Sequence, residues 1–303
     1  MYNPGGKLKK TSIRNDSRAD ILTNESNLTV TFWGVRGSTP VPGPETARYG
    51  GNTPCVEVRA NDSILVLDAG TGIQSFGRAM AKLGAKLGDQ PIKMDLFLTH
   101  THWDHIQGLP FFQLAYDPRN EINIIGPKRE GTQLIDCLER QMLPPNFPVP
   151  FSLLQGIKSV TEINAGETMT FGDATVTAQL LNHPNESMGY RIECGDKSLA
   201  YCLDHEHGDA EEIHPGLAAL ARDTDMLVFD AAYSDEEYPS FRGWGHSTWQ
   251  EGYKTAQALN VGTLALAGFN PGVVDSDLDA IKAKVDKLPG SVVIGTEGQK
   301  YTL

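Results

Sequence analysis

The sequence THTHWDH at residues 99–105 decides how the fold of this 303-residue chain is predicted. It follows a short apolar run, and residues two apart in an extended segment point the same way, so His100 and His102 can share one metal ion. Asp104 and His105 begin the next turn and face a second position. Three imidazoles and one carboxylate within six residues suit Zn²⁺, Mn²⁺ or Fe²⁺, and without a cation such a cluster is costly to bury. The stretch therefore predicts a metal site.

Strand and helix patterns alternate on both sides of this stretch. Before it, residues 28–35, 55–60 and 63–70 read as strands, residues 71–84 as a helix and residues 92–99 as a buried strand. After it, four short strands fill residues 169–204, with Gly or Asn/Asp turns between them, and are predicted to form one antiparallel sheet. Strands and helices then alternate again up to residue 298. Two β-rich halves with helices outside predict an α/β fold, a four-layer αββα sandwich with its site at the sheet edges.

Composition and charge limit the classes of function. The chain is 40% hydrophobic and 21% charged, an ordinary globular balance. It has no apolar leader and no run near the ~20 apolar residues of a membrane span, so we expect a cytoplasmic protein that does not contact a membrane. Its 26 Lys plus Arg against 38 Asp plus Glu give a net charge of −12, which predicts no extended nucleic-acid partner, although a small anion could bind at a metal.

The chain is expected to form one main domain. Residues 1–27 are polar and without periodicity, so they are predicted to be an irregular N-terminal arm without a role in the chemistry. Residues 28–303 are assigned to a single domain, since a sandwich fold of this kind fills a chain of such length.

Five motifs together resemble those of the metallo-β-lactamase superfamily. They are H-x-H-x-D-H at residues 100–105, LDAG at 67–70, LNH at 181–183, YCLD at 201–204 and GHST at 245–248. The first is similar to the signature of the superfamily, and the last resembles the catalytic histidine motif of the branch that contains ribonuclease Z and cyclic phosphodiesterases. The resemblance covers about residues 29–303 and implies the αββα fold.

The resemblance also implies a set of metal ligands. One ion would be held by His100, His102 and His183, and Asp204 would bridge to a second ion held by Asp104 and His105. One or two Zn²⁺ ions, with Mn²⁺ or Fe²⁺ as alternatives, would clamp a phosphoryl oxygen and lower the pKa of a bridging water, so the nucleophile would be a metal-bound hydroxide. Taken singly, His183 and Asp204 could instead be ordinary loop or turn residues.

The expected catalytic residues are Asp104, His246 and Asp230. His246 is the candidate general acid, which would protonate the leaving alkoxide or bind a non-bridging phosphate oxygen. Asp230, at the end of an apolar run, could lie behind His246 and orient it. The alternative is that His246 only begins a helix capped by Ser247 or Thr248.

One ligand of the family pattern is missing. The family usually supplies a histidine after the penultimate strand, where this chain has Gly268. Asn270, offset by two residues, is a poorer zinc ligand than an imidazole. Three outcomes stay open: a weakened second site, rescue by His205 or His207, or a site with one metal ion.

The leading functional prediction is a metal-dependent phosphodiester hydrolase that acts on a small, cyclic nucleotide-like phosphodiester. The alternative is a degenerate metal-binding or sensing protein with an incomplete second metal site and little catalysis. Transfer-RNA processing is disfavoured, because the Pro-rich insert at residues 126–154 has few Lys or Arg. A lactamase or thioesterase activity stays open, because fold does not fix substrate, and so does a homodimer, which relatives often form.

Overall fold

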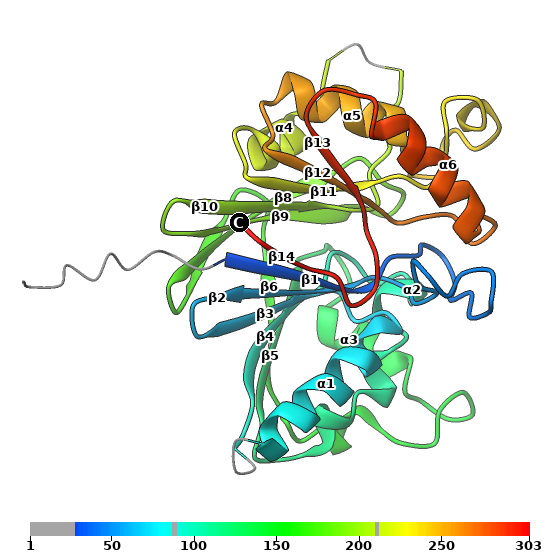
Figure 1. Ribbon diagram of the computed structural model, residues 1–303. Helices are drawn as coiled ribbons and strands as arrows, with labels where there is room; N and C mark the ends of the chain where they lie inside the picture. The colour runs from blue at the N-terminus through cyan, green and yellow to red at the C-terminus, as the bar shows by residue number, and fades with distance from the viewer. Residues whose placement is uncertain (1–27, 87–89, 210–211) are drawn as a thin grey trace, which may run out of the picture.

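Two seven-stranded β-sheets pack face to face in the computed structural model, which describes residues 28–86, 90–209 and 212–303 (Figure 1). Helices cover the two outer faces. On one side they are α1 (Gly72–Lys86) and α3 (Leu134–Arg140), and on the other α4 (Pro215–Ala221), α5 (Trp249–Ala258) and α6 (Asp275–Val285). The predicted α/β four-layer αββα sandwich is thereby confirmed. The arm predicted for residues 1–27 lies outside the described residues.

The first sheet changes from antiparallel to parallel pairing across its width. Its order is β14 (Lys300–Thr302), β1 (Leu28–Gly34), β2 (Cys55–Ala60), β3 (Ser63–Leu67), β4 (Lys93–Phe97), β5 (Glu121–Pro127) and β6 (Ile157–Ile163). Pairing is antiparallel from β14 to β3 and parallel from β3 to β6. Parallel neighbours end at the same edge of a sheet, so the residues that follow β3 and β4 lie close together.

The second sheet also has an antiparallel part and a parallel part. Its order is β13 (Ser291–Ile294), β12 (Thr263–Ala267), β11 (Met226–Asp230), β10 (Lys197–Cys202), β9 (Ser187–Cys194), β8 (Ala174–Leu181) and β7 (Thr168–Phe171). The four strands predicted within residues 169–204 pair antiparallel, as expected. Strands β10 to β13 are parallel, so their ends also share one edge.

Alternation along the strands builds two separate hydrophobic layers. Leu65 and Leu67 of β3 belong to the core between the sheets, whereas Val66 between them packs in the outer layer with Phe76 of α1. This is the two-residue period of a strand with both faces covered. The rings of Phe97 in β4 and Tyr190 in β9 lie 5.3 Å apart, so the two sheets contact each other directly near the edge where the His-rich segment begins.

Short helical segments lie in the connecting loops. They are α2 (Trp103–Ile106), η1 (Leu109–Phe111), η2 (Gln113–Tyr116), η3 (Phe151–Leu153) and η4 (Tyr238–Ser240). Within the described residues, no helix combines the length and apolar character needed to cross a membrane.

Candidate metal centre

Loops that follow β4, β8 and β10 bring the candidate ligands to one edge of the sandwich. His100 comes after β4 of the first sheet, while His183 and Asp204 follow β8 and β10 of the second. The backbone N–H of Met188 in β9 donates a hydrogen bond to the carbonyl oxygen of Thr99 at 2.9 Å. This bond joins the His-rich loop of one sheet to the other sheet, so the site is built from both halves of the fold.

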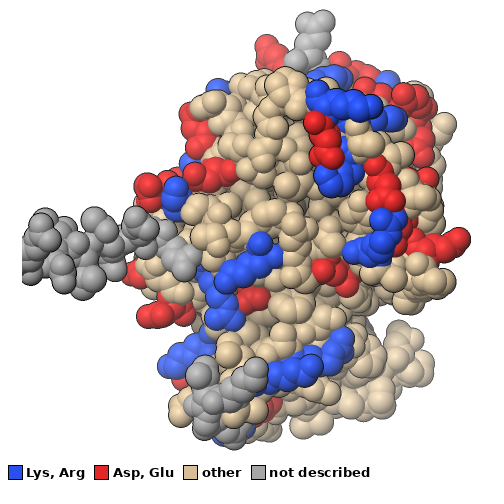
Figure 2. All heavy atoms as spheres, in the orientation of Figure 1, with Lys and Arg blue, Asp and Glu red and all other residues tan. Residues whose placement is uncertain are grey.

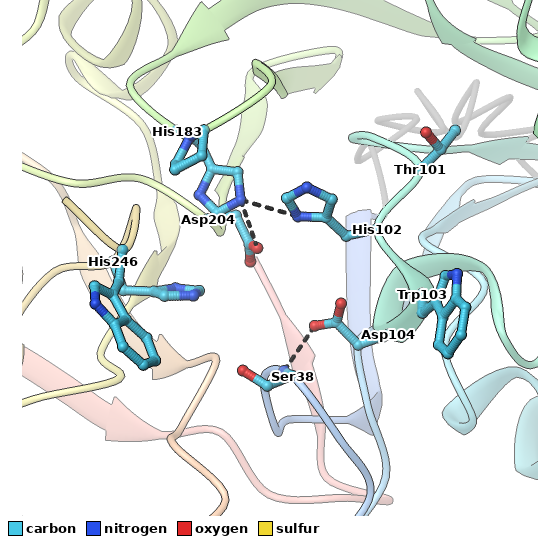
Figure 3. A pocket seen from close by; sticks show the side chains of 10 residues that line it. Ser38, Thr101, His102, Trp103, Asp104, His183, Asp204 and His246 are labelled. Atoms are coloured by element: carbon cyan, nitrogen blue, oxygen red, sulfur yellow. Dashed lines mark hydrogen bonds and ion pairs between the residues drawn. The ribbon is translucent and has the colours of Figure 1, made fainter. Parts of the chain in front are cut away.

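The first cluster consists of His100, His102, His183 and Asp204, whose ligand atoms all lie within 4.8 Å of one another. His183 Nε2 is 3.2 Å from His102 Nδ1 and 3.5 Å from Asp204 Oδ2 (Figure 3). His100 Nε2 also lies 3.5 Å from Asp204 Oδ2. Ligand atoms at the usual distance from a tetrahedral Zn²⁺ are about 3.4 Å apart, so this cluster has the spacing of a metal site.

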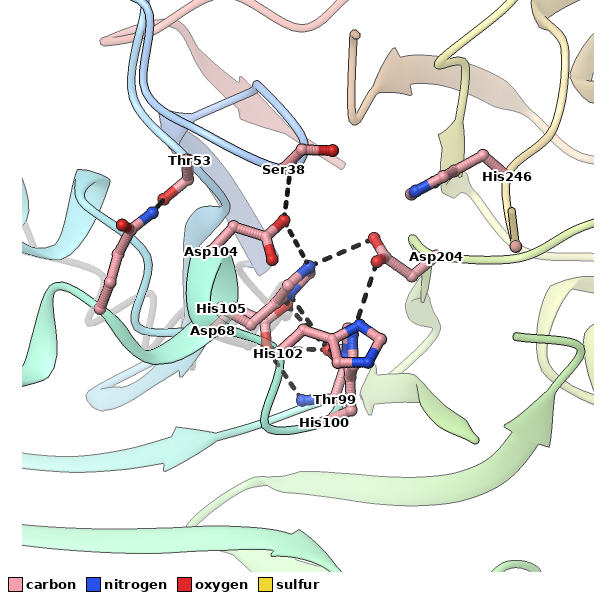
Figure 4. Close-up of polar contacts among 12 residues, drawn as sticks. Ser38, Thr53, Asp68, Thr99, His100, His102, Asp104, His105, Asp204 and His246 are labelled. Carbon is pink, nitrogen blue, oxygen red and sulfur yellow. Dashed lines mark hydrogen bonds and ion pairs between the residues drawn. The ribbon is translucent and has the colours of Figure 1, made fainter. Parts of the chain in front are cut away.

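The second cluster consists of Asp104, His105 and Asp204. His105 Nε2 lies 3.3 Å from Asp104 Oδ2 and 3.2 Å from Asp204 Oδ1 (Figure 4). The backbone N–H of Ser38 donates to Asp104 Oδ2 at 2.7 Å and fixes that carboxylate. Asp204 therefore presents Oδ2 to the first cluster and Oδ1 to the second, the arrangement of a bridging carboxylate.

Three buried ligand atoms in these clusters have no hydrogen-bond partner: His100 Nε2, His105 Nε2 and Asp204 Oδ1. Leaving a buried polar atom unpaired costs about 1–3 kcal/mol, so three together at one place require an explanation. Imidazole nitrogen and carboxylate oxygen are the ligands that Zn²⁺ and other divalent transition metals take in proteins. The donor set therefore fits divalent metal ions, which would satisfy all three atoms.

Hydrogen bonds on the far side of the imidazoles aim their free nitrogens into the clusters. His105 Nδ1 donates to Asp68 Oδ2 at 2.8 Å, and His183 Nδ1 donates to the carbonyl oxygen of Gly245 at 2.8 Å. Tyr201 Oη also donates to Asp68 Oδ2, at 3.0 Å. Partners of this kind fix the ring orientation of a metal-binding histidine, so the Nε2 atoms of His105 and His183 are the ones that face the clusters.

Two of the three candidate ligands in the second cluster are carboxylates, and their charge affects the pKa of the third, His105. Burial, the largest influence on His105, lowers its pKa, but Asp204, Asp68 and Asp104 raise that pKa well above its ordinary value. Burial favours the neutral form of Asp204, yet the neighbouring His105 holds the pKa of this carboxyl well below its usual range. Burial lowers the pKa of His100 well below that of a free histidine. His100 is thus neutral, the form that binds a metal, and the carboxylates supply charge that a cation would balance.

His246 faces the clusters from the second sheet. Its Nδ1 donates to Asp230 Oδ2 at 2.7 Å, and the backbone N–H groups of Asp204 and Ser247 donate to the same carboxylate at 3.1 Å each. Burial lowers the pKa of His246, but the charge and hydrogen bond of Asp230 outweigh this and raise it to about 9. The cap of α5 is Thr248, whose side chain accepts from Glu251 N, so helix capping does not occupy His246.

Gly268 is the residue expected from the sequence at the position of the missing ligand. Its φ is 73°, which strains any other residue, but a Cβ atom built on it would lie 3.6 Å from Leu203 Cδ2 and 3.7 Å from Asp230 Oδ2, so it would make ordinary contacts and start beside Asp230. His205 and His207 do not take its place. Both line a separate small cavity, and in the described part of the chain neither belongs to a cluster with metal-ligand spacing. Rescue by these two histidines is therefore not seen.

A cavity of about 540 Å³ opens over both clusters. Besides candidate ligands and His246, its wall contains Ser38, Thr101, Trp103, Pro184 and Trp244. Ser38 was not predicted, because its contact with Asp104 uses the backbone N–H and leaves no side-chain pattern. The sequence signal that could have indicated Ser38 was its place in the Gly-containing loop that follows the first strand. Trp103 lies within the H-x-H-x-D-H motif, and Trp244 directly precedes the GHST motif. The sequence alone does not reveal that the two side chains are exposed.

Known proteins with this pattern match most of the chain. Residues 64–269 match the Beta-lactamase superfamily domain. Ribonuclease Z of Thermoplasma acidophilum is 22% identical in an alignment that covers 84% of this chain and 90% of the relative. The metallo-beta-lactamase fold protein YhfI of Bacillus subtilis has a TM-score of 0.65 at 19% identity, over 92% of this chain and 100% of its own. A diphosphatase from the PhnP family has a TM-score of 0.62 at 17% identity, over 91% and 97%.

These relatives correct one expectation. The prediction of no extended nucleic-acid partner is wrong, because curated relatives are ribonucleases by name. The net charge of −12 is a sum over the whole chain, whereas a nucleic acid contacts one face through local Lys and Arg. On the face seen in Figure 2, Lys and Arg lie alongside Asp and Glu, so the total charge does not describe this face.

The sequence motifs, the observed sandwich and the match over residues 64–269 agree on the family. Residues of these motifs form the His and Asp clusters that could hold divalent metal ions. The chain belongs to the beta-lactamase superfamily and is a hydrolase with the metallo-β-lactamase fold.

Proposed function

We propose that this protein is a metal-dependent hydrolase of phosphodiesters. The observation that carries the proposal is the position of Asp204 between two clusters, with Oδ2 near His183 Nε2 and Oδ1 near His105 Nε2. Both clusters adjoin the cavity into which His246 projects. A phosphodiester needs its negative oxygens neutralised and its leaving oxygen protonated, and this arrangement offers groups for both tasks.

Zn²⁺ in one or both clusters is the proposed metal. Divalent ions in such a pair neutralise phosphoryl oxygens and lower the pKa of bound water. His100, His102 and His183 would hold the first ion, Asp104 and His105 the second, and Asp204 both. Because Gly268 provides no side chain, the second cluster has three protein ligands, and we expect its affinity to be the lower of the two.

His246 is the proposed catalytic acid and Asp230 its positioning residue. With a pKa of about 9, the imidazole of His246 carries a proton at neutral pH. Its Nδ1–H is engaged by Asp230, so the proton on Nε2 is the one available to the leaving alkoxide or to a non-bridging phosphate oxygen. General acid catalysis of this kind contributes about 10²–10⁴-fold.

A compact phosphodiester such as a cyclic nucleotide is the proposed substrate. A cavity of about 540 Å³ supports this, because sites for small molecules measure about 300–1,000 Å³. RNA is the second candidate, since relatives named ribonuclease Z align over most of this chain. The two candidates require the same bond cleavage and differ in the size of the group attached to the phosphate.

Hydrolysis of bis-p-nitrophenyl phosphate tests the proposal. Protein stripped with a chelator and then loaded with Zn²⁺, Mn²⁺ or Fe²⁺ should turn over this substrate, and His246→Ala and Asp104→Ala should lower kcat about a hundredfold or more. His214→Ala is the matched control, because His214 lies outside both clusters and does not line the cavity over them. Absence of turnover with every ion, in protein whose bound metal has been measured, would favour the metal-sensing alternative.

A second assay separates the two substrate classes. The metal-loaded protein is incubated with 2′,3′-cyclic and 3′,5′-cyclic nucleotides and, separately, with a precursor transfer RNA. Turnover of a cyclic nucleotide supports the compact substrate. Cleavage of the precursor RNA alone would replace the compact substrate with RNA and leave the proposed chemistry in place.

A further inference from the structure

Two exposed tryptophans form part of the cavity wall. Trp103 is 81% exposed and Trp244 is 63% exposed, and both line the cavity over the metal clusters. Indole rings bury large apolar areas when they can, and exposed apolar groups gathered at a site mark a binding surface. The polar clusters suit the phosphate of a substrate, whereas these rings suit a flat apolar part of it.

The loop that carries Trp244 is anchored on both sides of the indole. The backbone N–H groups of Gly243 and Gly245 donate to the carboxylate of Glu206 at 2.7 and 2.8 Å. Tyr238 Oη donates to the same carboxylate at 2.8 Å. With its two neighbours fixed to one carboxylate, the backbone of Trp244 cannot withdraw from the cavity without breaking these bonds.

The ring of Trp244 also has an aromatic support. Phe241 contacts it edge to face, with ring centroids 5.4 Å apart, and Phe241 is itself stacked on Tyr233 at 4.3 Å with nearly parallel planes. Tyr233 is buried. An indole held in this way loses little conformational freedom when a ligand stacks on it, which favours binding.

Trp103 reaches the cavity from the opposite side. It is the first residue of α2 and stands between the candidate ligands His102 and Asp104. In Figure 3 it lies across the site from His246, whereas Trp244 precedes His246 by two residues in the chain. The two indoles therefore reach the cavity on connections that follow strands of different sheets, β4 for Trp103 and β11 for Trp244.

We infer that Trp103 and Trp244 bind a planar ring system of the substrate, and that the substrate class is a phosphodiester that carries an aromatic heterocycle such as a nucleobase. The inference rests on the proposed function for the position of the phosphate. Stacking on aromatic side chains suits every nucleobase, because each has a π face. The two tryptophans determine specificity and take no part in proton transfer.

Two substrates with one leaving group test the inference. They are thymidine 5′-(p-nitrophenyl phosphate) and methyl p-nitrophenyl phosphate, and we expect the metal-loaded protein to prefer the first. Trp103→Ala and Trp244→Ala should each reduce the ratio of the two kcat/KM values about tenfold, equivalent to about 1.4 kcal/mol, mainly through KM. Trp103→Phe and Trp244→Phe should retain most of the preference, because phenyl rings also stack.

Phe111→Ala is the matched control. It removes a ring that is 56% exposed but does not line the cavity, so the ratio should not change. If the ratio is unchanged in both alanine variants of the tryptophans, or if Phe111→Ala lowers it equally, the inference is overturned.

Tryptophan fluorescence gives a readout that does not depend on turnover. Thymidine 5′-monophosphate should quench the emission, inorganic phosphate should not, and the quenching should disappear in the Trp103→Ala/Trp244→Ala double variant, which retains Trp33 and Trp249. Quenching without hydrolysis of either ester would uphold this inference and contradict the proposed function. Hydrolysis of both esters without quenching would support the proposed function and overturn this inference.

Discussion

Asp230 and His246 form a closely coupled pair, in which Asp230 Oδ2 lies 2.7 Å from His246 Nδ1 and the carboxylate is fully buried. The same oxygen accepts the backbone N–H of Asp204 at 3.1 Å. One carboxylate therefore orients both the candidate acid and the backbone of Asp204. The charge of Asp230 raises the pKa of His246, whereas its hydrogen bond with the backbone N–H of Asp204 holds the loop that carries Asp204.

Replacing Asp230 with Asn should separate these two effects. Asn can keep its one oxygen at the Oδ2 position, where the backbone N–H of Asp204 and His246 Nδ1 donate, but it loses the acceptor that Ser247 N–H uses at Oδ1. It also removes the charge that raises the pKa of His246, so kcat for bis-p-nitrophenyl phosphate should fall about a hundredfold. Bound metal, measured by elemental analysis, should stay at the wild-type level. Parallel loss of metal and activity would contradict a role that acts through His246.

Asp68 should affect the second cluster more than the first. Its carboxylate accepts from His105 Nδ1 and from Thr99 N at 2.8 Å each, and its φ of 64° is one that Asn tolerates. Asp68→Asn should therefore fold and weaken metal binding about 10–100-fold at the position beside His105, as measured by zinc titration calorimetry. Tyr201→Phe, which removes one neutral hydrogen bond to Asp68, should have a smaller effect. Equal weakening at both positions would contradict the assignment.

A histidine at Gly268 should increase occupancy of the second metal position. The contacts of an added Cβ are no closer than 3.6 Å, but the left-handed backbone costs a non-glycine residue about 1–2 kcal/mol. Gly268→His should therefore bind more metal per chain than the parent and melt at a lower temperature. Gly268→Ala carries the same backbone cost without the imidazole and should show only the lower Tm. No gain in metal over Gly268→Ala would mean that Gly268 does not occupy the ligand position.

Asp95 supplies a prediction about pH and stability. Burial raises its pKa above the ordinary value, although Asn123 Nδ2 donates to it and lowers the pKa. The folded state thus holds this proton more tightly than the unfolded state, so stability falls as the pH rises from the ordinary to the raised pKa, and the loss persists at neutral pH.

The expected result is that Asp95→Asn melts above wild type at pH 7, by less than about 3 °C. The difference should narrow as the pH is lowered toward the ordinary pKa of an aspartate. Asp62→Asn, at an exposed turn position, should change Tm less. A lower Tm for Asp95→Asn at pH 7 would mean that the hydrogen bond with Asn123 outweighs the burial of the charge.

Local patterns allowed most of the fold to be predicted. The alternation within residues 169–204 and the apolar run before His100 gave the strands because neighbouring residues carry that information. Two strands were not predicted. The first, β6 (Ile157–Ile163), is an edge strand whose exposed faces dilute its apolar pattern, and the second, β14 (Lys300–Thr302), has three residues and is defined by its pairing with β1.

Some residues of the candidate site could likewise be predicted from local sequence, and others could not. His100, His102, Asp104 and His105 are close in sequence, so their spacing alone indicated a shared site. Asp204 was predicted only through the family resemblance, since its approach to His105 joins residues 99 positions apart. The backbone contact of Ser38 and the exposure of Trp244 depend on how loops from the two sheets meet, and no short motif encodes that.

The proposed metal dependence is tested most directly by the hydrolysis of bis-p-nitrophenyl phosphate by one preparation measured in three states: as purified, after metal removal with a chelator, and after Zn²⁺ is restored. Because three buried ligand atoms have no hydrogen-bond partner, we expect activity to disappear with the metal and to return with it. Equal activity in the metal-free protein, or no activity in protein with measured bound Zn²⁺, would contradict the proposed metal dependence.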